Sequence, residues 1–113
     1  MLTVTPFSAV ECFVAGFRYG EGYEILESMS AGDPVTLNAE PGNPYDPCAV
    51  RVEHRRSRIG YVPRVLNQPV FTALQQGESV KARIVQFDPQ RPGWEALRIE
   101  IASEVDPSPV SPD

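Results

Sequence analysis

The chain has 113 residues, of which 42% are hydrophobic and 22% charged, so its length and composition are those of one globular domain. A formal net charge of −5 argues against generic nucleic-acid binding, which uses a broadly basic surface. No apolar run is long enough to span a membrane and no basic start precedes an apolar run, so we expect a cytoplasmic protein without a signal peptide.

The first part of the chain predicts two strands and one short helix. Residues 1–8 show no clear period and are predicted as a lead-in. Val10–Gly16 alternates apolar side chains and predicts a buried strand. Glu21–Met29 is a short helix candidate, and Val35–Ala39 predicts the next strand.

The middle of the chain predicts a loop followed by a hairpin. Pro41–Pro47 holds three prolines and reads as a stiff loop. Cys48–Glu53 and Arg58–Tyr61 predict the two strands, with His54–Ser57 as a polar turn between them. We therefore expect His54 at the surface.

After the hairpin the pattern predicts a broken helix and two more strands. Pro63 can open a helix, but Pro69 is expected to interrupt it, which leaves one turn and then a second piece over Pro69–Gln76. Val80–Phe87 and Trp94–Ile101 both alternate apolar and polar residues, as strands with one buried face do.

These elements predict a mainly β fold, with residues 9–103 as the domain and 104–113 as a disordered acidic tail rich in proline and serine. Six short strands with one or two short α-helices are typical of a small, closed or nearly closed barrel, because closure removes exposed strand edges.

The proline-rich loop concentrates polar and aromatic groups. Within four residues it places an amide, a phenol and a carboxylate, from Asn43, Tyr45 and Asp46. Gly42 permits one position of positive φ, while the prolines restrict the unfolded chain and so reduce the entropy lost on ordering. A stiff loop that carries such groups is better suited to recognition than to a plain connection.

Positive charge gathers just after this loop. Residues 51–64 hold five arginines and one glutamate, a local balance of 5 − 1 = +4. Such an edge can hold a few phosphates on an otherwise weakly acidic body. Arg55, Arg56 and Arg58 fit either a solvated hairpin or a contact with a partner.

No catalytic constellation is visible, and we expect neither an enzyme nor a cofactor. The only histidine, His54, lies beside arginines, so a nucleophile–histidine pair has little support. Cys12 and Cys48 are expected as reduced, buried thiols, and no metal site is predicted. Glu40 and Asp46 could pair as carboxylates, although acids beside prolines are more often solvated loop groups.

Three sequence blocks, in order, resemble the HIRAN domain family. They are VAGFRY at Val14–Tyr19, EPGNPYDPCAVRV at Glu40–Val52 and IGYVPR at Ile59–Arg64. The resemblance covers roughly residues 9 to 88. Members occur at the N-terminus of helicase-like fork-remodelling ATPases and as small bacterial proteins, and the resemblance implies a barrel similar to an OB-fold.

The resemblance also implies a function, because the matching positions of the family bind the 3′ end of single-stranded DNA. Tyr19 and Tyr45 would stack on the terminal bases. Asp46 would accept a hydrogen bond from the free 3′-hydroxyl, and Arg18 and Arg64 would contact phosphates.

Two positions depart from the pattern of some members. Tyr61 stands where some have histidine, and it is either a contact for DNA or a half-buried packing residue. Gly42 stands where some have a second asparagine, which leaves Asn43 for polar contacts to bases. Asp46 has an alternative role as the cap of an Asx turn.

Two functions follow. The first is a module that binds single-stranded DNA at its 3′-hydroxyl end, linked to DNA repair or stalled-fork processing, with a helicase or nuclease as a possible protein partner. The second is a non-catalytic adaptor that contacts a protein through the same barrel; the net negative charge favours it.

Overall fold

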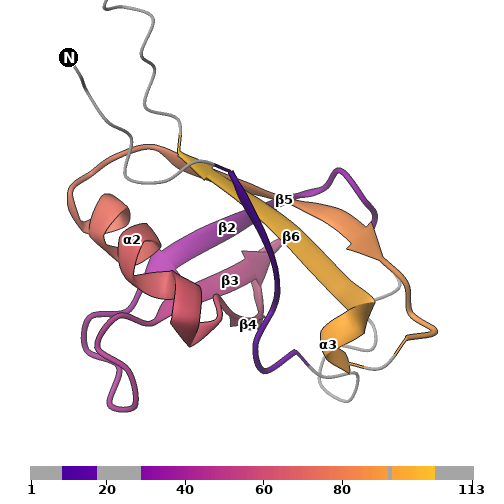
Figure 1. Cartoon of the computed structure of the whole chain (residues 1–113), viewed down its shortest axis with the longest axis horizontal. Coiled ribbons are helices and arrows are strands. Elements are labelled where there is room, and N and C mark those ends of the chain that lie inside the picture. Colours follow the sequence, from indigo (N-terminus) through magenta and orange to yellow (C-terminus); the bar gives the residue numbers. More distant parts are fainter. Residues whose placement is uncertain (1–8, 18–28, 92, 104–113) are drawn as a thin grey trace, which may run out of the picture.

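The computed structural model describes residues 9–17, 29–91 and 93–103, which form a six-stranded sheet with two helices (Figure 1). The strand order is β1-β6-β5-β2-β3-β4, and every pairing is antiparallel. The predicted lead-in, residues 21–28 of the predicted helix Glu21–Met29 and the acidic tail lie outside the described residues. In chain order the elements are β1 (Val10–Phe13), β2 (Pro34–Ala39), β3 (Val50–His54), β4 (Ser57–Tyr61), α2 (Arg64–Gln75), β5 (Val80–Phe87), α3 (Gly93–Ala96) and β6 (Leu97–Ser103).

The two edges of the sheet meet, so the sheet curls into a small OB-like barrel as the strand pattern predicts. Ala15, just after β1, exchanges two backbone hydrogen bonds of 2.8 and 2.9 Å with Tyr61 at the end of β4. Gly60 makes this approach possible. Its φ is +151°, and a Cβ on it would overlap the Ala15 carbonyl oxygen and the Val14 side chain.

Alternating apolar residues fill the barrel, as predicted for most of its strands. Val50 and Val52 on β3 are fully buried, and so are Ile99 and Ile101 on β6. Helix α2 packs against β2, β3 and β5, and its apolar face completes the core (Figure 1). This burial is the main source of stability for a domain of this size.

The expectation that Pro69 breaks the helix is wrong, because α2 runs unbroken from Arg64 to Gln75. Pro69 has no N–H to donate to the carbonyl of Val65, and its ring is exposed on the solvent side. On the opposite side Val70 and Ala73 are buried. Tertiary packing of that face outweighs the missing hydrogen bond.

The expectation that His54 lies at the surface is also wrong, since only 1% of the residue is exposed. Strand β3 extends to His54, and the inward alternation of Val50 and Val52 continues to the imidazole. Its Nε2 lies 3.1 Å from Oδ2 of Asp33, which provides a polar partner inside the barrel wall.

The last strand begins later than the predicted Trp94. Ala96 and Leu97 are both buried, although neighbouring residues on a regular strand point to opposite faces. A short helical turn, α3, accommodates this pair, and the Asp88 N–H donates to the Ala96 carbonyl at 2.8 Å. Regular alternation starts only at Leu97.

Gly60→Ala should lower the free energy of unfolding by about 2 kcal/mol or more, because the new Cβ meets backbone at the barrel closure and φ is positive. Chemical denaturation measures this. Gly42→Ala is the matched control, since no atom lies within 4 Å of its added Cβ and its φ is not positive. Equal stability of the two variants would contradict the closure.

Candidate functional site

The loop between β2 and β3 is held in shape by its own side chains. Oδ1 of Asn43 accepts the backbone N–H groups of Tyr45 and Asp46 at 2.8 and 3.0 Å. Oδ1 of Asp46 accepts the N–H of Cys48 at 2.9 Å, which is the predicted Asx turn. Gly42 has no positive φ, so the expected use of its conformational freedom is wrong. The loop depends on these hydrogen bonds and on its prolines.

The carboxylate of Glu40 ties this loop to the sheet. Oε1 accepts Nδ2 of Asn43 and the hydroxyl of Tyr61, each at 3.0 Å, and Oε2 accepts Nη1 of Arg51 at 2.6 Å. These donors, Asn43 first, hold the pKa of Glu40 below its usual value although burial opposes them. Glu40 is therefore an ionised structural group and not the solvated acid expected from the sequence.

The carboxylate of Asp46 positions a cation beside the loop. Its Oδ2 accepts Nδ2 of Asn67 at 2.9 Å and lies 3.4 Å from Nε of Arg64. Arg64 also donates from Nη2 to the carbonyl oxygen of Tyr45 at 2.8 Å. The Cys48 N–H and then these two side chains lower the pKa of Asp46, so it is ionised at neutral pH.

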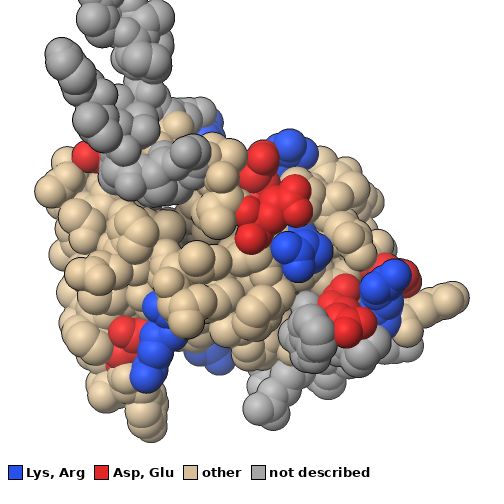
Figure 2. All heavy atoms as spheres, in the orientation of Figure 1, with Lys and Arg blue, Asp and Glu red and all other residues tan. Residues whose placement is uncertain are grey.

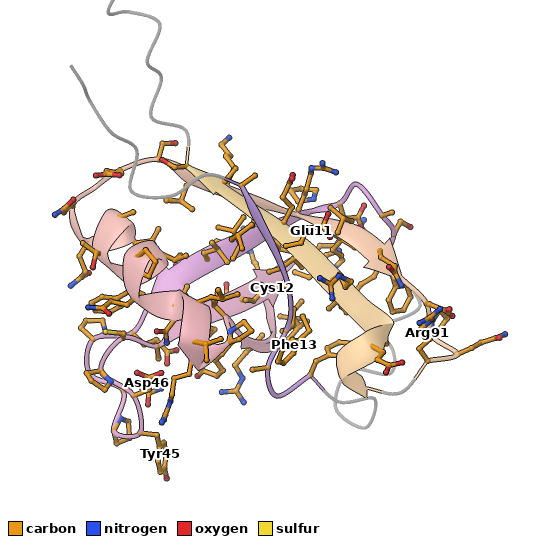
Figure 3. All side chains as sticks on the ribbon, viewed as in Figure 1. Glu11, Cys12, Phe13, Tyr45, Asp46 and Arg91 are labelled. Carbon is orange, nitrogen blue, oxygen red and sulfur yellow. The ribbon has the colours of Figure 1, made fainter. Side chains whose placement is uncertain are left out.

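Beside the loop lies an open hollow of about 390 Å³, with Tyr45 at its margin. Tyr45 is 84% exposed, and Figure 3 shows it projecting from the tip of the loop while Asp46 lies closer to the body. Since the backbone around it is fixed, the ring is presented without a large entropy cost. The lining residues are Ala15, Asn43, Tyr45, Asp46, Ala49, Tyr61, Val62 and Arg64.

The structure brings together five of the seven site residues predicted from the sequence, and they are Asn43, Tyr45, Asp46, Tyr61 and Arg64. The other two, Arg18 and Tyr19, lie outside the described residues. The segment before them does reach the site, because Ala15 lines the hollow. Phe17 is buried, as expected for a core residue.

Sequence reasoning missed two residues that organise the site. Glu40 was expected as a solvated acid, yet it opens the block EPGNPYD and lies next to the polar groups that it binds. Asn67 is buried on α2, where Val70 and Ala73 share its face. A lone amide on an apolar helix face is the signal that could have revealed it, because buried polar groups need partners.

The charges around the site are mixed. On the face in view, Figure 2 shows acidic and basic side chains in small neighbouring groups, with no continuous basic surface there. Arg51 is held between Glu40 and Glu53 at 2.6 and 2.7 Å. Arg64, in contrast, has a side chain that is 70% exposed, so its charge faces solvent at the rim of the hollow.

Other chemistry has little support in the described part of the chain. There, no group of three His, Cys, Asp or Glu side chains is placed to bind a metal ion. Over the same residues no helix is long and apolar enough to cross a membrane. Both cysteines are free; burial raises the pKa of the Cys12 thiol to about 11, and Cys48 is half-buried.

Glu40→Gln should lower the free energy of unfolding at neutral pH by about 1–3 kcal/mol, because the amide turns a donor toward Arg51. Ionised Glu40 contributes stability above its ordinary pKa of about 4.5, and this is lost as pH falls through the lower folded pKa. The parent should therefore lose more stability below pH 4.5 than Glu40→Gln does.

Denaturation of both proteins across this pH range measures the difference. Glu11→Gln is the control, because its exposed carboxylate lies 3.7 Å from Arg98 and such surface pairs contribute about 0–1 kcal/mol. If Glu40→Gln and the parent show parallel acid profiles, Glu40 does not hold the loop.

Comparisons with known proteins identify relatives that share the fold. A small protein from Lactobacillus plantarum is 28% identical with a TM-score of 0.72, and the match covers 86% of this chain and 91% of that one. The HIRAN domain of human HLTF shares the fold, at 15% identity and a TM-score of 0.63 over 85% of this chain and 74% of that one. No curated protein matches the chain. The HIRAN domain model matches residues 7–106, so the chain belongs to the HIRAN domain family, whose members are nucleic-acid-binding modules.

Proposed function

We propose that this domain binds single-stranded DNA at its 3′-hydroxyl end and that it acts by binding, without catalysis or a cofactor. One observation carries the proposal: an exposed aromatic ring, a guanidinium and an ionised carboxylate lie side by side at one hollow, from Tyr45, Arg64 and Asp46. A strand end offers a base, a phosphate and a hydroxyl, and each group suits one of them.

Tyr45 supplies the surface for a base. Stacking on an aromatic side chain contributes about 1–3 kcal/mol per base and tolerates any sequence. The ring is exposed on a stiff loop, and Asn43 fixes that loop through the N–H groups of Tyr45 and Asp46. Asn43 thus supports the site by positioning its neighbours, because both ends of its amide are engaged within the loop.

Arg64 supplies the contact for a phosphate. Two of its nitrogens are oriented by the Tyr45 carbonyl and the Asp46 carboxylate, and the rest of the guanidinium is exposed. Because the protein already restrains the side chain, less conformational entropy is lost when a phosphate binds. Arg18 and Tyr19 would add a second phosphate contact and a second stacking ring, as the family resemblance implies.

Asp46 explains a preference for the strand terminus. A carboxylate repels phosphates, but it accepts a hydrogen bond from an uncharged terminal hydroxyl. A carboxylate has about four acceptor positions, and the Cys48 N–H, Asn67 and Arg64 take three. Tyr61 lines the hollow, and its ring is held in place because its hydroxyl donates to Glu40.

Recognition of a free 3′ end suits a cytoplasmic role in DNA repair or stalled-fork processing, with a helicase or nuclease as the partner that acts on the end. A non-catalytic protein adaptor is the second candidate. The net charge of −5 and the mixed surface charges favour it. The two candidates differ in whether the chemistry of a strand end changes binding.

The deciding test compares strands that end in a 3′-hydroxyl or a 3′-phosphate. The protein should prefer the hydroxyl by at least about tenfold, because about 1.4 kcal/mol is a factor of ten and a hydrogen bond to a charged acceptor is worth roughly 1.5–3 kcal/mol. Asp46→Asn should remove most of this preference. Fluorescence anisotropy measures both; equal affinity of the parent for the two ends would favour the adaptor.

Arg64→Ala should weaken binding to strands of any sequence by about tenfold and reduce the slope of log K against log salt by about 0.7, the value for one phosphate on a single strand. Arg91→Ala is the control for net charge, because Figure 3 places Arg91 at the other end of the molecule from Tyr45. A salt slope identical in Arg64→Ala and the parent would contradict the phosphate contact.

A further inference from the structure

The turn between β3 and β4 carries two arginines in a costly conformation. Arg55 and Arg56 have φ values of +52° and +74°, as both central residues of a type I′ turn must. Asn-Gly is the favoured pair in such turns, and other residues pay on the order of 1 kcal/mol or more at positive φ. Other residues would form the same turn at lower cost, so we infer that the guanidinium groups have a function beyond forming the turn.

These two residues and Arg58, here termed the hairpin arginines, carry positive charge with no direct partner among the described residues, although the charge of Arg55 helps to lower the pKa of Asp33. All three are exposed, and within the described residues none of them forms an ion pair or a side-chain hydrogen bond. The nearby carboxylates are engaged elsewhere. Asp33 binds His54, and Glu53 binds Arg51 at 2.7 Å.

A β-bulge places one of the hairpin arginines, Arg58, on the same strand face as Tyr61 of the hollow. Glu53 pairs with Arg58, but Val52 pairs with Gly60, so the β4 strand contains one extra residue between them. In a regular strand Arg58 and Tyr61, three residues apart, would point to opposite faces. The bulge places both on the outward face, where the partner of Tyr61 is Arg51.

The hollow and the hairpin arginines therefore mark the two ends of one surface. Strand β4 has five residues at about 3.3 Å each, so the turn lies roughly 15 Å from Tyr61. β3 leads away from the loop in Figure 1 and ends at this turn. Between them Glu40 and Glu53 are both bound by Arg51, which reduces their repulsion of a polyanion.

We propose that the hairpin arginines bind internal phosphates of the strand whose 3′ end lies at the hollow. The proposal rests on the proposed function and adds the path of the strand. The hollow has the volume of a small-molecule pocket and takes only the end, whereas OB-fold sites span about 4–16 nucleotides. Guanidinium groups suit phosphates because they form paired, charge-assisted hydrogen bonds.

The test uses the double variant Arg55→Asn/Arg56→Gly, which removes two charges and installs the pair that a type I′ turn favours. Its melting temperature should therefore equal or exceed that of the parent. Its affinity for a three-nucleotide strand with a 3′-hydroxyl should stay within about twofold. Its affinity for a twelve-nucleotide strand should fall about tenfold, with a salt slope lower by about 1.4, or 0.7 for each lost phosphate contact.

The double variant Arg91→Gln/Arg98→Gln removes the same charge elsewhere and should bind both strands as the parent does. Equal affinity of the hairpin variant and the parent for the long strand would overturn the inference while leaving end binding intact. The inference would also be overturned if the control variant lost as much affinity for the long strand, or if the hairpin variant lost equal affinity for short and long strands. If the parent binds neither strand, the proposed function and the inference both fail.

Discussion

The candidate site depends on the hydrogen bonds that the carboxylate of Glu40 accepts. This carboxylate accepts hydrogen bonds from the loop, from β3 and from β4, through Asn43, Arg51 and Tyr61. Only an ionised carboxylate can accept from all three without presenting a donor to one of them. The fixed amide of Asn43 then sets the backbone of Tyr45, so one half-buried charge determines how the exposed ring is presented.

A second set of polar contacts, centred on Asp46, fixes the charged groups at the rim of the hollow. Asp46 caps the turn through Cys48, reaches Asn67 on α2 and orients Arg64 at the rim. The helix and the loop are thereby joined beside the hollow. A site built in this way needs little reorganisation when a ligand binds, which reduces the entropy cost of binding. Barrel closure at Gly60 keeps β4 and its Tyr61 against this loop.

The sequence predicted the barrel well, because alternation of apolar residues is a local property and most of the six strands display it. The predictions that failed each have a specific physical cause. Pro69 was expected to break α2, but burial of the opposite helix face keeps the helix continuous. His54 was assigned to a turn because its residue type is polar, although its position continues the inward set of β3. Ala96 and Leu97 are neighbours and both are buried, which the alternating pattern of a strand does not predict.

The candidate site was predictable only where its residues stand in recognisable blocks. Tyr45, Asp46 and Arg64 were identified in this way, and the structure brings them to one hollow. The supporting roles of Glu40 and Asn67 depend on contacts across 11 to 21 residues of sequence, which no local pattern encodes. The bulge that aligns Arg58 with Tyr61 likewise appears only in the strand register.

The most direct test of end recognition is to follow backbone amide NMR shifts while a three-nucleotide strand with a free 3′-hydroxyl is added. The largest changes should lie in the non-proline residues of 43–46 and 61–64, around the hollow. Residues of α3 (Gly93–Ala96) and β6 (Leu97–Ser103) serve as internal references and should move little. Saturating changes confined to those references, or none anywhere at millimolar strand, would contradict a 3′-end site at this loop.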